Sequence, residues 1–201
     1  MIAVIDYGVG NLFSLQCSLA AIGAESVITG DAEVIQKADK LILPGVGAFG
    51  DAAAALEKSG LVPVIQEEVK KGKPLLGICL GMQLLFERSY EYGVHNGLGL
   101  LKGEVKPLGD YVTGLKIPHM GWNSLDITAS SPLMKYTAQG DYVYFVHSYC
   151  AVDCKDSLIA TANYGIDVTA VVGKDNVYGT QFHPEKSGDV GLNILKAFSE
   201  I

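Results

Sequence analysis

The sequence predicts an α/β fold: an open, mostly parallel central sheet with helices on both faces, and additional mixed or antiparallel strands in the second half. Two observations support this prediction. Over residues 1–90, short apolar runs alternate with segments of helical spacing, which is typical of a parallel sheet covered on both faces. From residue 104 onward, strand-like runs follow one another through short turn-rich segments without obvious helices between them, which favours mixed or antiparallel pairing.

The first half begins with the apolar run Ile2–Ile5, which predicts a buried parallel strand. A turn-rich segment follows at residues 6–11, and residues 12–22 then place their apolar side chains on one helical face before Gly23. The same patterns predict strands at 26–28, 40–43 and 74–78, a helix after the cap residue Asp31, and helices at 52–58, 61–71 and 80–87.

The second half contains six strand-like runs and one closing helix. We predict strands at 104–108, 122–127, 142–146, 158–163, 168–172 and 177–182, and a helix at 190–198 with Asp189 as its cap. No internal repeat, linker or low-complexity tract interrupts the chain. We therefore expect residues 1–201 to form one domain.

Composition excludes several classes of protein. The 201 residues carry 22 acidic and 15 basic side chains, for a net charge of −7, and Arg88 is the only arginine, a balance that argues against nucleic-acid binding. The first cation is Lys37, so the start lacks the basic region of a signal peptide, and no apolar run approaches the ~18 residues of a membrane span. We expect a cytoplasmic protein without membrane contact, whose four cysteines stay reduced.

The segment from Gly77 to Gly81 has the form of a nucleophile elbow with cysteine at its centre. A strand that turns sharply into a helix strains the residue at the turn, and small residues two positions before and after prevent clashes. This geometry exposes the Cys79 sulfur at a helix start, where the Leu80 N–H faces an oxyanion forming on the attacked carbonyl. The alternative is a buried structural cysteine between two packing glycines.

A nucleophilic thiol needs a base, and His183 is the best placed of the four histidines. It follows the predicted strand 177–182, and Glu185 lies two positions beyond it. On an extended segment these two side chains point the same way, so Glu185 can orient the imidazole toward Cys79. Cys79 and His183 both end strands, at the edge where open α/β sheets place their sites. Otherwise His183 and Glu185 are simply solvent-exposed loop residues.

Two other motifs resemble a cofactor site and a metal site. Residues 45–50 match the dinucleotide-binding pattern G-x-G-x-x-G. The match lies in the third strand–helix unit, whereas a dinucleotide site is expected in the first. The alternative is that Gly45 to Gly47 supply backbone N–H groups to an oxyanion hole. His147, Cys150 and Cys154 do not match a zinc spacing, and no fourth ligand is evident. We therefore expect no metal.

Together these residues resemble the class I, or triad-type, glutamine amidotransferases. The two motifs that carry the resemblance are Gly77-Ile78-Cys79-Leu80-Gly81-Met82-Gln83 and Gln181-Phe182-His183-Pro184-Glu185-Lys186-Ser187. Within this family, the segments at 44–50, 118–123 and 144–149 resemble those of the glutaminase subunits of imidazole glycerol phosphate synthase. The resemblance implies a flavodoxin-like fold, no cofactor, and hydrolysis of L-glutamine to L-glutamate and ammonia through a cysteinyl thioester. It assigns catalysis to Cys79, His183 and Glu185, and the oxyanion hole to Val46, Gly47 and Leu80. The residues that it implies for glutamine binding are Gly45, Gly47, Gln83, Ser148 and Tyr149. Those that it implies for the partner interface are His119, Trp122 and Lys186.

The resemblance also implies a partner. Ammonia would pass to a (β/α)8-barrel cyclase subunit in a heterodimer that serves histidine biosynthesis. The scarcity of arginine agrees with phosphate chemistry in the other subunit. The alternatives are a glutaminase subunit of another synthase, for pyridoxal phosphate or anthranilate, and a non-catalytic regulatory module of the same fold.

Overall fold

A central eight-stranded sheet organises the computed structural model, which describes residues 1–201. Its strands are, in chain order, β1 (Ile2–Ile5), β2 (Ser26–Thr29), β3 (Lys40–Leu43), β4 (Leu75–Ile78), β9 (Asp126–Ile127), β12 (Leu158–Asn163), β13 (Asp167–Lys174) and β14 (Val177–Thr180). In space the order is β2-β1-β3-β4-β14-β13-β12-β9. The pairs from β2 to β14 are parallel, and those from β14 to β9 are antiparallel. The predicted fold class is confirmed.

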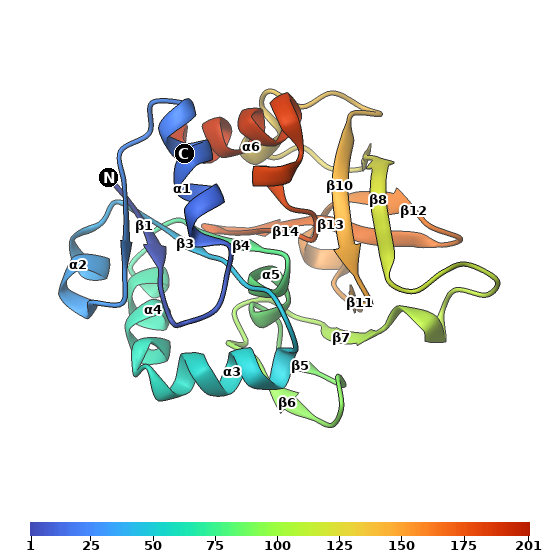
Figure 1. Cartoon of the computed structure of the whole chain (residues 1–201), viewed down its shortest axis with the longest axis horizontal. Coiled ribbons are helices and arrows are strands. Elements are labelled where there is room, and N and C mark those ends of the chain that lie inside the picture. The colour runs from blue at the N-terminus through green and yellow to red at the C-terminus, as the bar shows by residue number, and fades with distance from the viewer.

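Six helices cover the two faces of this sheet (Figure 1). They are α1 (Leu12–Ala21), α2 (Ala32–Lys37), α3 (Phe49–Lys58), α4 (Leu61–Lys70), α5 (Leu80–Leu84) and α6 (Gly188–Glu200). Side chains alternate across each strand, so Ile2 and Val4 join a core of 23 buried residues with α1 and α6. Ala3 and Ile5 join the opposite core of 26 buried residues with α2 to α5. None of the helices has the length and apolar character needed to cross a bilayer.

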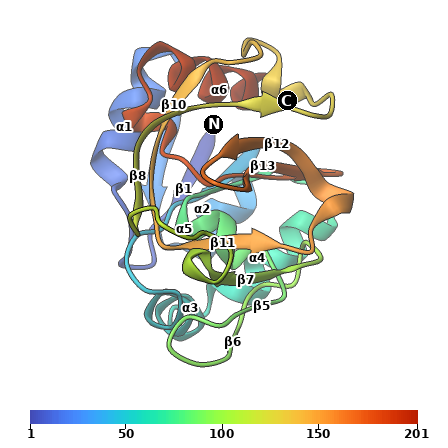
Figure 2. The ribbon, with the colours of Figure 1, turned by 90° about the vertical axis from the view of Figure 1, so that its right-hand side faces the viewer.

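Two smaller sheets lie beside the antiparallel end of the main sheet (Figure 2). One pairs β8 (His119–Ser124) with β10 (Tyr142–His147). The other has the order β11-β7-β5-β6 and comprises β5 (Arg88–Ser89), β6 (His95–Asn96), β7 (Glu104–Pro107) and β11 (Tyr149–Val152). The chain passes from β10 to β11 through Ser148 alone, so this residue lies where the two small sheets meet.

Most predicted elements are present, and the exceptions have local causes. The run 122–127 is two strands, because the ladder with β10 ends at Ser124 and Leu125 turns its N–H to Asp141 O. The helix predicted to reach residue 87 ends at Leu84, since backbone N–H groups of residues 97–101 bond to the carbonyls of residues 84–87. Strands β5, β6 and β11 were not predicted.

Helix caps give one confirmation and one correction. Asp31 caps α2 as predicted, because its side chain accepts a hydrogen bond from the Glu33 N–H at 2.8 Å. Asp189 does not cap α6. That helix begins at Gly188 with Ser187 at the N-cap position, so Asp189 lies inside the first turn.

Candidate active site

The site lies where two neighbouring parallel strands end. β4 pairs with β14 in a register that sets Ile78 opposite Thr180, and the Cys79 N–H donates to Thr180 O at 2.7 Å. Cys79 and His183 therefore leave the same edge of the sheet from adjacent strands. This is the edge at which open α/β sheets place their sites, as predicted for these two residues.

Cys79 adopts the strained backbone expected of a nucleophile elbow. Its φ of 54° and ψ of −110° are unusual for a residue other than glycine. The sharp turn brings α5 against β3, so that a Cβ on Gly81 would lie 1.9 Å from Leu43 O. Glycine is thus required by close approach of the two backbones.

His183 and Glu185 are hydrogen-bonded to each other, with 2.8 Å between Nδ1 and Oε1. The predicted contact is present, but its geometry differs from the prediction: Pro184–Lys186 form a 3₁₀ turn rather than an extended segment. Burial by itself lowers the pKa of His183. Hydrogen bonds with Cys79 and Glu185 outweigh burial and raise the pKa to about 9. A protonated imidazole held between a thiol sulfur and a carboxylate suits proton transfer.

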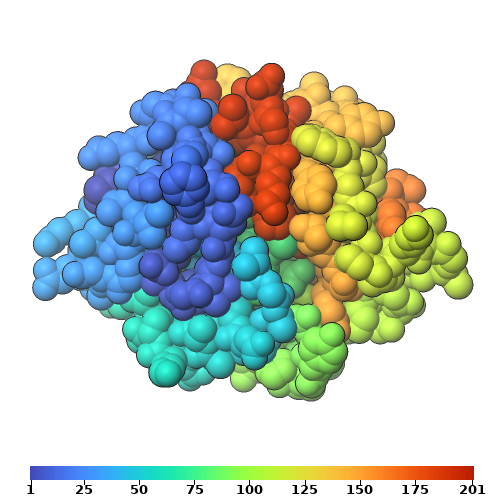
Figure 3. Space-filling view, in the orientation of Figure 1, coloured from blue at the N-terminus to red at the C-terminus, as the bar shows by residue number.

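A cavity of about 330 Å³ opens beside the elbow. Figure 3 shows the segments after β3, after β14 and at the end of β10 meeting near the middle of one face. Nine residues predicted for the site or interface line this cavity: Val46, Gly47, Cys79, Leu80, Gln83, Ser148, Tyr149, His183 and Lys186. The structure therefore brings together most of the residues that the sequence singled out.

Two predicted residues lie behind the cavity wall rather than on it. Gly45 packs against the elbow, where a Cβ would lie 2.7 Å from Gly81 N, and it does not line the main cavity. The Glu185 carboxylate faces His183 with one oxygen, while its Oε2 is buried without a hydrogen-bond partner. Both residues support the groups that face the cavity.

The predicted interface residues divide into exposed and buried ones. Trp122 is 54% exposed, and Lys186 is exposed at the cavity rim. His119 is only 2% exposed and is stacked against the rings of Phe145 and Tyr164, and its place near the partner stays a prediction. The cause of this division is strand alternation, because residues 119 and 122 of β8 point to opposite faces.

His147 lines the cavity and belongs to a buried histidine pair. Its Nδ1 is 2.8 Å from Tyr149 O and its Nε2 is 2.9 Å from His119 Nδ1. Burial lowers the pKa of both imidazoles to about 4, so both are neutral at physiological pH. No cluster of three or more histidine, cysteine or acidic side chains is arranged to hold a metal ion, and the Cys154 thiol instead contacts Thr169 Oγ1.

Glu91 is a cavity residue that the sequence did not indicate. It follows β5, its Oε2 accepts a 2.6 Å hydrogen bond from the Phe49 N–H, and it places a buried carboxylate in the wall. The surrounding strands are two residues long, so no periodic pattern could have identified the segment.

Known proteins resemble the chain over its whole length. The family model described as glutamine amidotransferase class-I matches residues 3–200. A HisH subunit of imidazole glycerol phosphate synthase from Lactococcus lactis is 54% identical over 200 residues, covering 99% of this chain and 98% of the relative. The HisH subunit from Oceanobacillus iheyensis is 52% identical over 202 residues, covering 100% and 99%.

Solved structures share the fold at low sequence identity. One described as a glutamine amidotransferase has a TM-score of 0.78 at 18% identity and covers 100% of both chains. PurLQS from Thermotoga maritima has a TM-score of 0.77 at 22% identity, covering 98% of this chain and 96% of that one. At these low identities, the two structures show that the chain shares their arrangement of sheet and helices, and nothing beyond the fold.

Proposed function

Because the chain belongs to the class I glutamine amidotransferases, and within them to the HisH subunits of imidazole glycerol phosphate synthase, we propose that Cys79, His183 and Glu185 catalyse the hydrolysis of L-glutamine. The observation that carries this proposal is the His183–Glu185 hydrogen bond of 2.8 Å, formed beside the strained Cys79 in one cavity. Residues 1–201 act as one glutaminase domain in this proposal.

The first half of the reaction forms a thioester. The Cys79 sulfur attacks the side-chain amide carbon, a C–S bond forms, and charge develops on the carbonyl oxygen. The N–H groups of Leu80 and of the Val46–Gly47 segment, which border the cavity beside Cys79, stabilise this oxyanion. His183 gives its proton to the departing nitrogen as the C–N bond breaks, and ammonia leaves.

The second half releases glutamate. His183, now neutral, takes a proton from water, and the resulting hydroxide attacks the thioester carbon. The C–S bond breaks and its electron pair returns to the Cys79 sulfur. Glu185 keeps the imidazole oriented through its Nδ1, so the other ring nitrogen faces the reacting atoms in both halves.

We assign glutamine binding to further residues that line the cavity. Gln83 donates its amide hydrogens to Tyr149 O and Gln181 Oε1, which leaves its own oxygen free to accept from the substrate. Ser148, Tyr149 and Gly47 complete the contact surface, with Gly45 supporting it from behind the elbow. The negatively charged Glu91 carboxylate in the cavity wall attracts the positively charged α-ammonium group of glutamine.

A cyclase subunit of the HisF-type (β/α)8-barrel kind receives the ammonia as partner in a heterodimer. Support comes from the exposed side chains of Trp122 and Met120 on β8, 54% and 64% exposed, and from the exposed Lys186 at the cavity. The assembled synthase works in the cytoplasm, where free cysteines persist as thiols.

The Cys79→Ala variant tests the chemistry. We expect glutamate release to fall at least ~10³-fold and labelling by an electrophilic glutamine analogue to disappear, because no other group can form the thioester. Both are measured on the chain co-purified with a barrel cyclase, with coupled glutamate detection and peptide mass spectrometry.

Cys17→Ser is the matched control, since Cys17 is an exposed cysteine outside the site. It should leave both readouts at the wild-type level. Residual labelling of Cys79→Ala at another cysteine would show that the nucleophile is misassigned. Failure of the chain and an authentic cyclase to restore growth of a histidine auxotroph would refute the partner and favour another synthase.

A further inference from the structure

Gln181 is a fully buried amide that touches the reactive sulfur. It follows β14 two positions before His183, is 0% exposed, and its Nε2 lies 3.8 Å from Cys79 Sγ. Its side chain does not border the main cavity. The residue thus reaches Cys79 from the protein side of the sulfur rather than from the substrate side.

The hydrogen bonds around Gln181 determine which end of its amide faces the sulfur. Gln83 Nε2 lies 3.2 Å from Tyr149 O, a backbone carbonyl that can only accept, so this atom of Gln83 must be the nitrogen. The same nitrogen donates its second hydrogen to Gln181 Oε1 at 3.0 Å. With the oxygen of Gln181 used in this way, its NH₂ group faces Cys79 Sγ.

A donor in this position interacts more strongly with a thiolate than with a thiol, because hydrogen bonds to an ionised acceptor are stronger than neutral ones. Cys79 is only 7% exposed, so a buried donor adds to the stabilisation that His183 gives the negative sulfur. The backbone of Gln181 is itself fixed, since its N–H donates to Ala170 O at 2.8 Å. The donor is therefore held in place before the reaction begins.

We propose that Gln181 is a further catalytic residue of the glutaminase reaction, whose side-chain amide donates a hydrogen bond to the Cys79 sulfur and stabilises its thiolate form. The proposal rests on the nucleophilic role of Cys79 proposed above. The hydrogen bond stabilises the negative sulfur at two stages. The first is before the attack on the amide, and the second is when the C–S bond of the thioester breaks and its electron pair returns to sulfur. Gln83 is the positioning residue that keeps the donor turned toward Cys79.

A purely structural role for Gln181 makes a different prediction. If its amide only held Gln83 against Tyr149, its loss would disturb glutamine binding and raise KM. Loss of a donor to the sulfur instead lowers kcat and slows the reaction of Cys79 with any electrophile, including one that does not resemble glutamine. Alkylation by iodoacetamide therefore separates the two roles.

The test replaces Gln181 by methionine, which keeps the length of the side chain and removes the donor. Gln83 Nε2 retains Tyr149 O as its acceptor, so no buried donor loses all its partners. We expect Cys79 to be alkylated about tenfold more slowly near neutral pH, with the pH–rate curve displaced toward higher pH. In the complex with the cyclase, kcat should fall by a similar factor with KM within twofold. Gln181→Asn, which withdraws the amide by one methylene, should reproduce the result if Gln181→Met folds poorly.

Two internal references make the result interpretable. Exposed Cys17 reports the intrinsic reagent rate in the same peptide digest and should be unchanged. Thr169→Val removes another buried polar side chain that contacts a thiol, since Thr169 Oγ1 lies 3.5 Å from Cys154 Sγ, and it should leave Cys79 alkylation at the wild-type rate.

An unchanged Cys79 pH–rate curve in Gln181→Met, or a rise in KM alone, would overturn the proposal. An equal slowing in Thr169→Val would also overturn it, because the effect would then come from general loosening of the core. These outcomes differ from failure of the proposed function, in which wild-type Cys79 would not be labelled by the glutamine analogue at all.

Discussion

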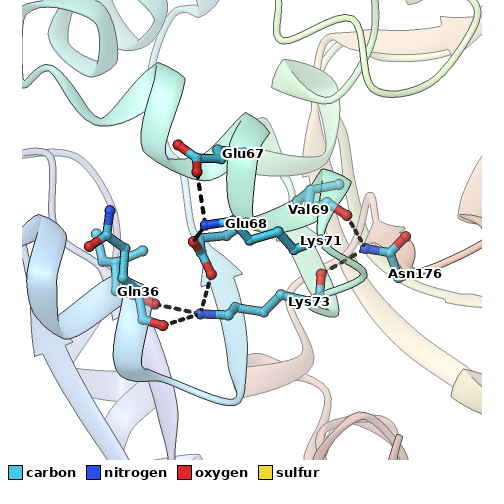
Figure 4. Close-up of polar contacts among 8 residues, drawn as sticks. Gln36, Glu67, Glu68, Val69, Lys71, Lys73 and Asn176 are labelled. Atoms are coloured by element: carbon cyan, nitrogen blue, oxygen red, sulfur yellow. Dashed lines mark hydrogen bonds and ion pairs between the residues drawn. The ribbon is translucent and has the colours of Figure 1, made fainter.

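Strands β4 and β14 lie side by side, and their two ends differ in how completely their polar groups are satisfied. At the amino-terminal ends the Leu75 N–H donates to Asn176 O at 2.9 Å. Figure 4 shows the Asn176 side chain, which donates to Val69 O at 2.9 Å and to Lys73 O at 2.8 Å. One asparagine thus ties the start of both strands to the end of α4.

A buried ion pair completes this amino-terminal end. Lys73 donates to the carbonyls of Ile35 and Gln36 at 2.9 and 2.7 Å, near the end of α2, and its Nζ lies 2.7 Å from Glu68 Oε2. The other oxygen of Glu68 contacts Lys71 at 2.8 Å. Hydrogen bonds from Lys71 and Lys73 hold the pKa of Glu68 below its usual range. Both oxygens of this buried carboxylate have a partner.

The carboxyl ends of the same strands are less fully satisfied. Cys79 is held at a φ of 54°, and Glu185 keeps one buried oxygen without a partner. Strained and incompletely bonded groups persist only where the surrounding structure holds them, and they collect at functional sites. The amino-terminal ends of the two strands therefore contribute mainly to stability and the carboxyl ends to chemistry, and single substitutions should separate these two contributions.

His183→Asn is the sharpest change at the carboxyl end. Asparagine can still donate to Glu185 from a position close to that of Nδ1, but it has no second ring nitrogen to move a proton. We expect turnover per folded molecule in the complex to fall at least ~10³-fold. The free energy of unfolding should also fall, because the buried Glu185 carboxylate loses its positively charged partner. Glutamate release and urea unfolding measure the two quantities. Turnover within tenfold of wild type would remove His183 from the mechanism.

Lys73→Met is the corresponding change at the amino-terminal end. It removes the donor from two carbonyls and one partner from Glu68, whose side chain is only 6% exposed. We expect a loss of about 2–4 kcal/mol in the free energy of unfolding, with glutamate release per folded molecule unchanged well below the melting temperature.

Lys37→Met is its matched control. Lys37 pairs with Glu33 on the surface at 3.5 Å, and the two side chains are 74% and 80% exposed. This pair should contribute no more than about 0.5 kcal/mol. Equal losses in the two lysine variants would contradict a special role for the Lys73 network.

The elbow could be predicted because its determinants are local. A strand, a small residue on each side of the cysteine and a following helix are all adjacent in the sequence, so Cys79 needed no long-range information. Glu185 was predicted for a partly wrong reason. Its contact with His183 is present, but Pro184 starts a 3₁₀ turn that the extended interpretation did not include.

Other parts of the site depend on contacts that local patterns do not encode. Gln181 reaches Cys79 only because β14 pairs with β4, although the two residues are 102 positions apart. Glu91 enters the cavity from a segment with two-residue strands. His119 lies on the buried face of β8, opposite to Trp122, and the motif that contains both residues does not distinguish these two faces.

Asn176→Ala should have a smaller effect than His183→Asn and Lys73→Met. It removes two hydrogen bonds but leaves no charge unpaired, and Val69 O keeps its bond from the Gly72 N–H at 2.9 Å. We expect a loss of about 1–2 kcal/mol in the free energy of unfolding, measured in urea, and an unchanged kcat. Asn163→Ala is the control, because its exposed side chain makes a single 3.4 Å contact, with Asp167, and should contribute almost nothing. A fall in kcat on Asn176→Ala would mean that β14 transmits changes from the residue before it to His183, and the two ends of the sheet would then be coupled rather than separable.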